Sequence, residues 1–208
     1  MAKERLKSPR ARLFVALDLP EPVRAELVAW QAQALHDPAL RVIAPEALHV
    51  TLCFLAYRPE KEIERIAELV CGIEARTVTM RFAAEPVAVP RNRPRLFAVD
   101  AESEGAVALE AELSDRLQAE RFYKPERRPF WSHVTVARVK LERRTPSDRR
   151  RRRRGRPMLV EKLPGALPGE LLRPFDVSRM TLYRSHLRPT GAEYVSLAAL
   201  DLTSDGKG

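Results

Sequence analysis

Two histidines, each followed two residues later by a threonine, are the residues of this chain best suited to acid–base chemistry. His49 precedes Thr51, His133 precedes Thr135, and an apolar residue follows each threonine. In a β-strand, side chains two residues apart share a face, so each imidazole lies beside its hydroxyl. An imidazole exchanges protons near neutral pH, and a threonine hydroxyl can hydrogen-bond a phosphate oxygen. The two motifs together predict acid–base catalysis on a phosphate from two sides.

This chemistry divides between the two imidazoles. One takes a proton from an attacking water while the other gives a proton to the leaving oxygen, and each contribution is worth roughly 10²–10⁴-fold in rate. No nucleophilic Ser or Cys, Walker loop or carboxylate-rich metal cluster accompanies the histidines. We therefore expect catalysis without a metal or other cofactor.

Arg138 is a third candidate, because a guanidinium would neutralise a phosphate and its more highly charged transition state. It lies five residues after His133, so on an unbroken strand it would face the opposite side. A bulge near the strand end would bring it to the same side. Spacing alone leaves open the alternative of a solvent-facing arginine.

The chain contains an internal repeat. Residues 12–16 (RLFVA) resemble residues 95–99 (RLFAV) at an offset of 83, and the two histidines are offset by 84. Two matches in register predict two similar lobes, each with a strand, a helix and a His-x-Thr strand.

The periodicity of apolar residues predicts a mixture of helices and strands without strict βαβ alternation, which is an α+β fold. We expect one domain over 11–202, with lobes near 11–90 and 91–202 that may exchange strands, and an N-terminal tail over 1–10. Helices are expected from Pro22 to Ala34, over 59–74 and over 104–122. Strands are expected over 13–17, 41–43, 48–55, 77–89, 95–99, 132–139, 179–183 and 193–200.

The net charge of +9 is concentrated in one segment. Residues 143–156 contain nine arginines and one aspartate, so the rest of the chain carries only +1. The six consecutive arginines from Arg149 to Arg154 repel one another, and we expect this insertion to be flexible without a partner. Either it binds nucleic acid non-specifically through phosphates, or it is a solvated insertion.

Composition favours a cytoplasmic protein. No run of about 18 apolar residues predicts a transmembrane helix, and the charged residues 1–10 do not form a secretory signal. Cys53 and Cys71 lie in apolar surroundings without a CxxC spacing, so we expect both to be buried and reduced.

The motifs and their flanking phrases resemble the 2H phosphoesterase superfamily, and within it the RNA 2′,3′-cyclic phosphodiesterase (2′-5′ RNA ligase-like) family. The similarity covers nearly the whole chain except the first ten residues and the arginine insertion. It is carried by residues 12–18 (RLFVALD), 48–55 (LHVTLCFL), 129–138 with the second motif, 182–185 (LYRS), Gly191, Ala192 and Tyr194.

The resemblance implies a bilobal fold, with antiparallel or mixed sheet and outer helices around a central cleft. It implies hydrolysis of an RNA or nucleoside 2′,3′-cyclic phosphate to a 2′-phosphate, and is compatible with a weak reversible 2′-5′ RNA ligase activity. His49 would be the proton donor and His133 the proton acceptor. Thr51, Thr135 and Arg138 would hold the phosphate of the bound RNA or nucleotide end. Independently of the resemblance, we expect a monomer by default and no membrane contact.

Two aromatic residues are further site candidates, and two positions differ from the family pattern. Phe14 and Tyr183 are candidates for base or ribose contacts, although aromatic residues in strands commonly form core. Trp131-Ser132 precedes the second motif where a proline is common in the family, and Ala56 stands where a glycine is common. The alternative function is a non-catalytic module that binds RNA ends in the same cleft.

Overall fold

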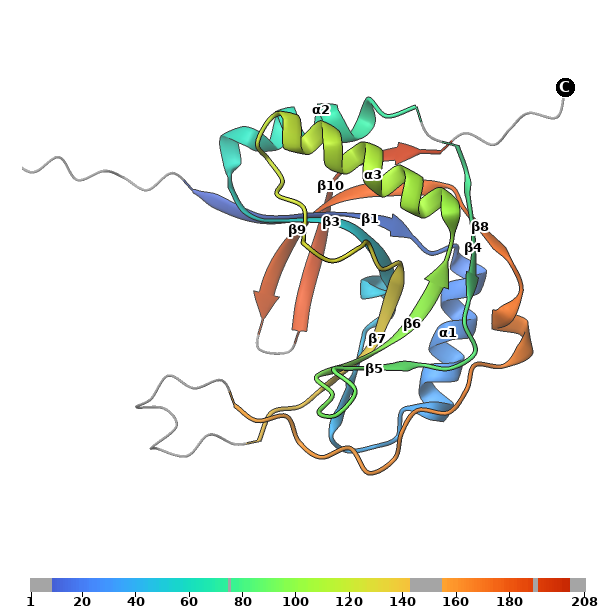
Figure 1. The fold of residues 1–208 in the computed structure, drawn as a ribbon. Coiled ribbons are helices and arrows are strands. Elements are labelled where there is room, and N and C mark those ends of the chain that lie inside the picture. Colours follow the sequence, from blue (N-terminus) through green and yellow to red (C-terminus); the bar gives the residue numbers. More distant parts are fainter. Residues whose placement is uncertain (1–8, 75, 143–154, 189–190, 203–208) are drawn as a thin grey trace, which may run out of the picture.

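The computed structural model describes residues 9–74, 76–142, 155–188 and 191–202. Over these residues the chain mixes helices and antiparallel strands, which confirms the predicted α+β class (Figure 1). The strands are β1 (Arg10–Asp18), β2 (Leu40–Val42), β3 (His49–Pro59), β4 (Val78–Phe82), β5 (Val87–Val89), β6 (Leu96–Glu102), β7 (His133–Val139), β8 (Phe175–Val177), β9 (Arg179–Arg188) and β10 (Gly191–Asp201). The helices are α1 (Glu21–Ala34), α2 (Ile63–Cys71) and α3 (Glu104–Ala119), with short 3₁₀ turns η1 (Pro45–Ala47), η2 (Glu60–Glu62) and η3 (Gly169–Leu172).

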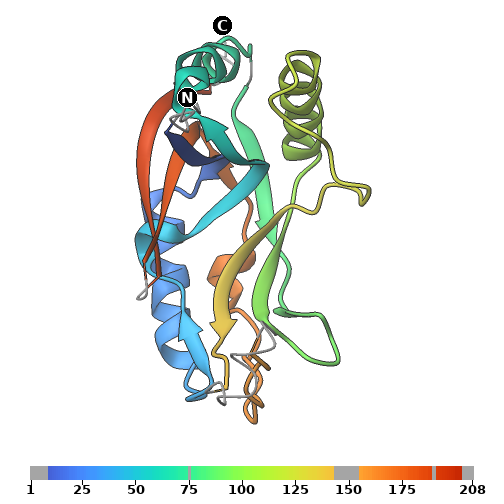
Figure 2. The same ribbon diagram turned by 90° about the vertical axis from the view of Figure 1, so that its left-hand side faces the viewer.

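The sheet has the order β10-β9-β1-β3-β7-β6-β4-β8, with β2 paired to β7 and β5 to β6. Its two halves meet where β3 pairs with β7, at the single register position Val50–Val134. Beyond this pair the halves diverge (Figure 2). Each repeated phrase forms the strand beside its own His-x-Thr strand, β1 beside β3 and β6 beside β7. The hairpin β9–β10 from late in the chain joins β1, while the lobe limits at residues 90 and 91 stay a prediction.

The elements form where the apolar spacing predicts them. In β4, Val78, Met80 and Phe82 are buried while Thr79 and Arg81 are exposed, as expected of a strand with one face in the core. Helix α1 begins with a proline in its first turn and buries Leu27 and Trp30.

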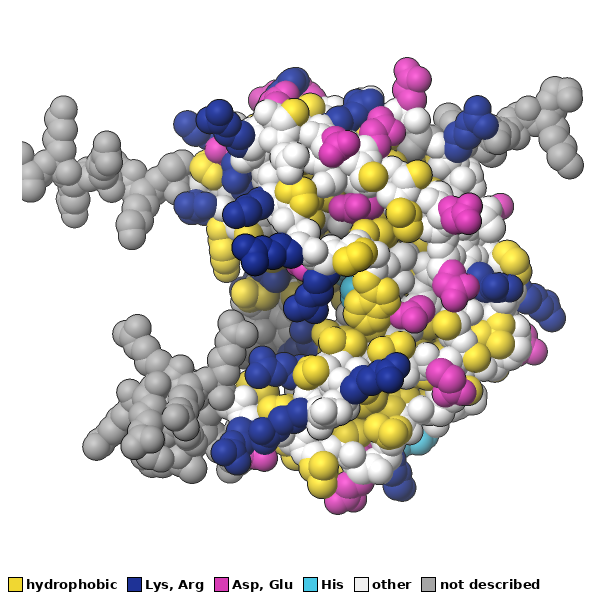
Figure 3. Space-filling model, in the orientation of Figure 1, with side chains coloured by type: hydrophobic (Ala, Val, Ile, Leu, Met, Phe, Trp, Pro, Cys, Tyr) yellow, Lys and Arg dark blue, Asp and Glu magenta, His cyan; other side chains and the backbone are white. Residues whose placement is uncertain are grey.

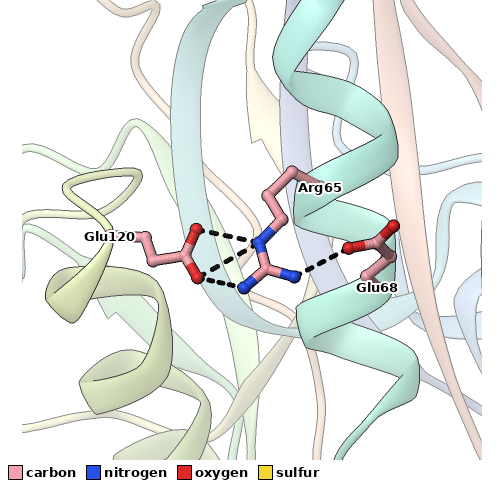
Figure 4. Close-up of polar contacts among 3 residues, drawn as sticks. All are labelled: Arg65, Glu68 and Glu120. Atoms are coloured by element: carbon pink, nitrogen blue, oxygen red, sulfur yellow. Dashed lines mark hydrogen bonds and ion pairs between the residues drawn. The ribbon is translucent and has the colours of Figure 1, made fainter.

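Helices α2 and α3 lie side by side over one end of the sheet (Figure 1). Arg65 of α2 donates to Glu120 at the end of α3, with Nε 3.0 and 3.1 Å from the two carboxylate oxygens, and its Nη1 lies 2.7 Å from Glu68 (Figure 4). The guanidinium lowers the pKa of the Glu120 carboxyl. This ion-pair network joins α2, which packs on β9 and β10, to α3, which packs on β3 and β4.

Some details differ from the sequence prediction. Cys71 is exposed rather than buried because α2 buries the face of Ile66 and Val70, and Cys71 lies outside that face, whereas Cys53 is buried in β3. Strand β8 and η3 were not predicted, and β3, β9 and β10 extend beyond their expected ranges. Within the described part of the chain, no helix is long and apolar enough to cross a membrane.

Two predicted segments lie mostly outside the described residues: residues 1–8 of the N-terminal tail and residues 143–154 of the arginine insertion. The bridge between Leu141 and Pro157 places the two ends of the insertion together, shortly after β7.

Candidate active site

The two His-x-Thr motifs meet at the centre of the sheet. His49 and His133 are the first residues of β3 and β7, and the residues that follow them, Val50 and Val134, are register partners. Both valines are buried against the core, so the imidazoles and threonines of both motifs point to the opposite face. His133 lies near enough to His49 to lower its pKa by charge repulsion. The structure therefore brings the four predicted residues together.

A backbone carbonyl two residues earlier in the chain binds each imidazole. His133 donates from Nδ1 to the Trp131 carbonyl at 2.7 Å, which leaves its Nε2 available to a substrate. The Ala47 carbonyl hydrogen-bonds the His49 imidazole, whose Nε2 lies 3.1 Å from Thr51 Oγ1. Such contacts fix the tautomer and orientation of an imidazole, so both rings are positioned before a substrate binds.

An aspartate lies opposite each histidine on the neighbouring strand. Asp18 of β1 is the register partner of His49, and Asp100 of β6 is the partner of His133. Asp18 accepts hydrogen bonds of 2.7 Å from the hydroxyls of Thr181 and Tyr183. Asp100 accepts one of 2.6 Å from the indole of Trp131.

Burial lowers the pKa of both histidines below 6.5. The pKa of His49 falls to about 4, and the charges of His133 and Arg138 add to the effect of burial. The pKa of His133 also falls through burial, but the Trp131 carbonyl and the Asp100 carboxylate oppose the change. Without a bound anion, burial therefore favours the neutral form of both imidazoles.

A β-bulge follows each threonine. The β1–β3 register skips Leu52 directly after Thr51, and the β6–β7 register skips Val136 directly after Thr135. Because of the second bulge Val136 and Ala137 are both buried, and Arg138 is exposed on the face that carries Thr135. Arg138 therefore faces the same side of the sheet as the histidines. Its charge lowers the pKa of His49, so the guanidinium lies within electrostatic reach of that imidazole.

The aromatic candidates surround His49. Phe14 is buried, and its ring centroid lies 4.9 Å from His49 and 5.2 Å from Tyr183 in stacked arrangements. Tyr194, which was not among the predicted site residues, packs edge-on against His49 at 5.3 Å. These rings contact the imidazole in the structure, and the suggested base or ribose contacts of Phe14 and Tyr183 stay a prediction.

Two cavities flank the histidines. The larger, of about 580 Å³, is lined by Thr51, Phe54, Trp131 and His133 and extends to α3. The smaller, of about 330 Å³, lies between the segment before His49, the end of β7 and the β9–β10 hairpin. In the space-filling view, Lys and Arg side chains gather around the hollow on the left of the molecule (Figure 3). Within the described part of the chain, no group of three or more His, Cys, Asp or Glu side chains is arranged to hold a metal ion.

Sequence reasoning missed Asp18, Asp100, Trp131 and Tyr194 as parts of the site. Trp131 was noticed only as a departure from the family pattern, yet its ring stacks on His133 with centroids 3.9 Å apart. The available signal was that each repeated phrase carries an aspartate shortly after its apolar run.

Two anchored imidazoles lie on one face of a divided sheet with paired threonines and an arginine, which is the arrangement expected of a two-histidine phosphoesterase. The sequence profile of the LigT-like phosphoesterases matches residues 17–97. The chain is 32% identical, over 93% of its length and 91% of the relative, to the RNA 2′,3′-cyclic phosphodiesterase of Thermus thermophilus. It is 27% identical to the protein of that name from Methanocaldococcus jannaschii, over 88% of this chain and 96% of the relative.

Solved structures agree on the fold. The crystal structure of TT0787 of Thermus thermophilus superposes with a TM-score of 0.72 at 27% identity, covering 93% of this chain and 99% of that one. Apo LigT of Escherichia coli superposes with a TM-score of 0.69 at 23% identity, covering 94% and 99% of the two chains. The chain belongs to the LigT-like phosphoesterases of the 2H superfamily.

Proposed function

We propose that this protein hydrolyses the 2′,3′-cyclic phosphate of an RNA or nucleotide end to a 2′-phosphate. The observation that carries the proposal is the placement of two backbone-anchored imidazoles, His49 and His133, on one face of the sheet with Arg138 beside them. Relatives named RNA 2′,3′-cyclic phosphodiesterase support the substrate class.

In the proposed reaction, His133 Nε2 accepts a proton from water, and the water oxygen bonds to phosphorus. The bond between phosphorus and the ribose 3′-oxygen breaks, and protonated His49 gives its proton to that oxygen. Thr51, Thr135 and Arg138 hold the non-bridging oxygens as their negative charge grows. The donor and acceptor assignment comes from the family resemblance. If the 5′-hydroxyl of a second RNA replaced water as the nucleophile, the same steps would join the two RNAs through a weakly formed 2′-5′ linkage.

The pKa of His49 sets a condition on this mechanism. A donor must carry a proton, yet burial holds the pKa of His49 at about 4 in the free protein. The bound phosphate is an anion and raises the pKa of a neighbouring imidazole, because it stabilises the charged form. Substrate binding therefore favours the protonated form of His49, which the reaction needs.

The decisive experiment follows a 2′,3′-cyclic nucleotide in EDTA and identifies the product by phosphorus NMR. We expect a nucleoside 2′-phosphate from the wild type, and losses of at least about 10²-fold for His49→Ala and for His133→Ala. His36→Ala is the matched control, because His36 is exposed on the chain after α1. Equal turnover by the wild type and both variants would contradict catalysis by the two histidines, and no turnover by the wild type would leave the non-catalytic RNA-end-binding alternative.

We also propose a cytoplasmic, monomeric enzyme that needs no cofactor. The two free cysteines suit a reducing compartment. Activity in EDTA tests the absence of a metal requirement, and light scattering tests the monomer.

A further inference from the structure

The smaller cavity beside the histidines is strongly basic. Arg12, Arg41, Arg138 and Arg188 line it, and no described Asp or Glu does. The larger cavity differs, because Glu110, Asp115 and Glu126 line it together with Lys124 and Arg128. If the terminal phosphate of an RNA strand lies between the histidines, the rest of that anionic strand would therefore be attracted toward the smaller cavity.

Arg41 and Arg138 form the most unusual feature of this cavity. They are direct register partners on the antiparallel strands β2 and β7, so both guanidinium groups project from the same face. Like charges directly opposite one another destabilise a strand pair. Within the described residues, neither side chain forms a hydrogen bond or an ion pair. A phosphate bound to Arg41, together with the reacting phosphate at Arg138, would remove the repulsion.

The other arginines are held at the walls of the cavity. Arg12 donates to Ser185 Oγ at 2.8 Å, and its guanidinium lies 4.5 Å from the centroid of the Phe54 ring. Arg188 pairs with Glu193 at 3.1 Å near the tip of the β9–β10 hairpin. Arg12 and Arg188 are thus held in place on either side of Arg41 and Arg138.

The cavity lies along the strand from the reacting phosphate. Because Val136 is bulged out of the register, Arg138 lies two register positions beyond Thr135, which is about 7 Å along a strand. Tyr194 joins the two regions, because its ring contacts His49 and also lines the cavity. A second phosphate of the same nucleic-acid strand can therefore reach Arg41 while the first lies between the histidines.

We propose that this cavity binds the internucleotide phosphate on the 5′ side of the terminal cyclic nucleotide, with Arg41 as its main contact and Arg188 as a second. The inference rests on the proposed function and sharpens it: the preferred substrate is an oligoribonucleotide with at least one internucleotide phosphate, rather than a mononucleotide. Guanidinium groups suit this task because they bind phosphate through two parallel hydrogen bonds.

The test compares a nucleoside 2′,3′-cyclic phosphate with the matching dinucleotide that ends in a 2′,3′-cyclic phosphate. In the wild type, kcat/KM is higher for the dinucleotide. Arg41→Ala lowers the dinucleotide value about tenfold, mainly through KM, and changes the mononucleotide value less than about twofold. Arg41→Lys retains part of the preference. Arg81→Ala, an exposed strand arginine outside both cavities, leaves both values unchanged.

Binding measurements separate this inference from the proposed activity. Calorimetry with a dinucleotide and a mononucleotide, each ending in a 2′-phosphate, gives tighter dinucleotide binding whether or not the protein is an enzyme. Arg41→Ala removes that difference and reduces the salt slope of dinucleotide binding by about one. Without ligand, the same variant does not lower the melting temperature, since it relieves repulsion.

Two outcomes overturn the inference. Equal losses for both substrates in Arg41→Ala would assign Arg41 to the reacting phosphate, and no loss for either would remove Arg41 from substrate binding. Hydrolysis of neither substrate by the wild type would overturn the proposed function, while the calorimetric difference would still decide the phosphate site.

Discussion

The His49 half and the His133 half of the site share one backbone frame but differ in their side-chain surroundings. In each half a carbonyl two residues earlier binds the imidazole, an aspartate lies opposite it on the next strand, and a bulge follows the threonine. The backbone arrangement is thus repeated together with the sequence, and it places two equivalent imidazoles on one face of the sheet.

The side chains around that frame are not repeated. His49 packs against Phe14 and Tyr194, whereas His133 stacks on Trp131 alone among the described aromatic residues. Five residues after each histidine, the first half has Phe54 and the second has Arg138. The repeated backbone thus sets the positions of the two imidazoles, while the unrepeated residues shift their pKa values through different contacts and put the guanidinium of Arg138 on one side.

The largest effect in this comparison is expected from Arg138. Arg138→Ala should lower kcat/KM by about 10²–10³-fold, because the growing charge on phosphate loses its guanidinium. Arg138→Lys should recover part of this loss. Initial rates with a cyclic mononucleotide measure both, and Phe54→Leu is the control at the equivalent position of the other half. A loss below threefold for Arg138→Ala would show that the bulge does not serve phosphate binding.

The pH dependence of the wild type should be bell-shaped and acidic. One imidazole must be charged and the other neutral, and burial puts both pKa values below 6.5 in the free enzyme. Values of kcat/KM should therefore fall above pH 6.5, where both are neutral, and below about pH 4, where both are charged. The profile of kcat should lie at higher pH, because bound phosphate raises both pKa values. A kcat/KM maximum above pH 7 would contradict these shifts.

Asp18 and Asp100 offer a direct comparison of the halves. Asp100 raises the pKa of His133, so Asp100→Asn should move the titration of that imidazole to lower pH. Asp18 instead accepts hydrogen bonds from Thr181 and Tyr183, so Asp18→Asn should leave the titration of His133 in place. Proton NMR of the imidazole signals measures both variants. An identical shift of His133 in both would refute the assigned difference.

Deleting Arg149 to Arg154 should affect binding of long RNA but not the chemistry. Removing six cations should weaken binding of an oligonucleotide and flatten the dependence of its affinity on salt. Turnover of a cyclic mononucleotide should stay within twofold of the wild type. A collapse of mononucleotide turnover would instead assign the segment to the active site.

The smallest effect concerns Ala56, just after the first motif. Its φ of 57° lies in the left-handed region, beside the bulge at which the β1–β3 register skips Leu55. Ala56→Gly should raise the free energy of unfolding by roughly 0.5–1 kcal/mol. Ala32→Gly, at an exposed position in α1, should lower it by about 1 kcal/mol. Urea denaturation compares them, and destabilisation by both would contradict the strain at Ala56.

The sequence predicted the elements that local pattern controls. Apolar spacing located α1, α3 and the two motif strands, and the repeat at offsets of 83 and 84 indicated which strands are equivalent. Ala56 was singled out by the family resemblance instead, because a glycine is common at its position. These features are local, so a single sequence contains them.

Long-range pairing could not be predicted. The Arg41–Arg138 pair joins residues nearly a hundred positions apart, and the partnership of Asp100 with Trp131 and His133 depends on the β6–β7 register. A one-residue bulge reversed the expected direction of Arg138, and periodicity cannot place such a bulge. The exposure of Cys71 likewise depends on which face of α2 packs against the rest of the protein.

The most direct test of the central claim uses a cyclic substrate in which sulfur replaces the ribose 3′-oxygen. A thiolate leaves without protonation, so a variant that lacks the proton donor should regain activity. We predict that the thio substrate restores turnover to His49→Ala but not to His133→Ala, while the normal substrate is hydrolysed by neither. Rescue of His133→Ala alone would reverse the donor and acceptor, and full activity of both variants on the normal substrate would contradict two-histidine catalysis.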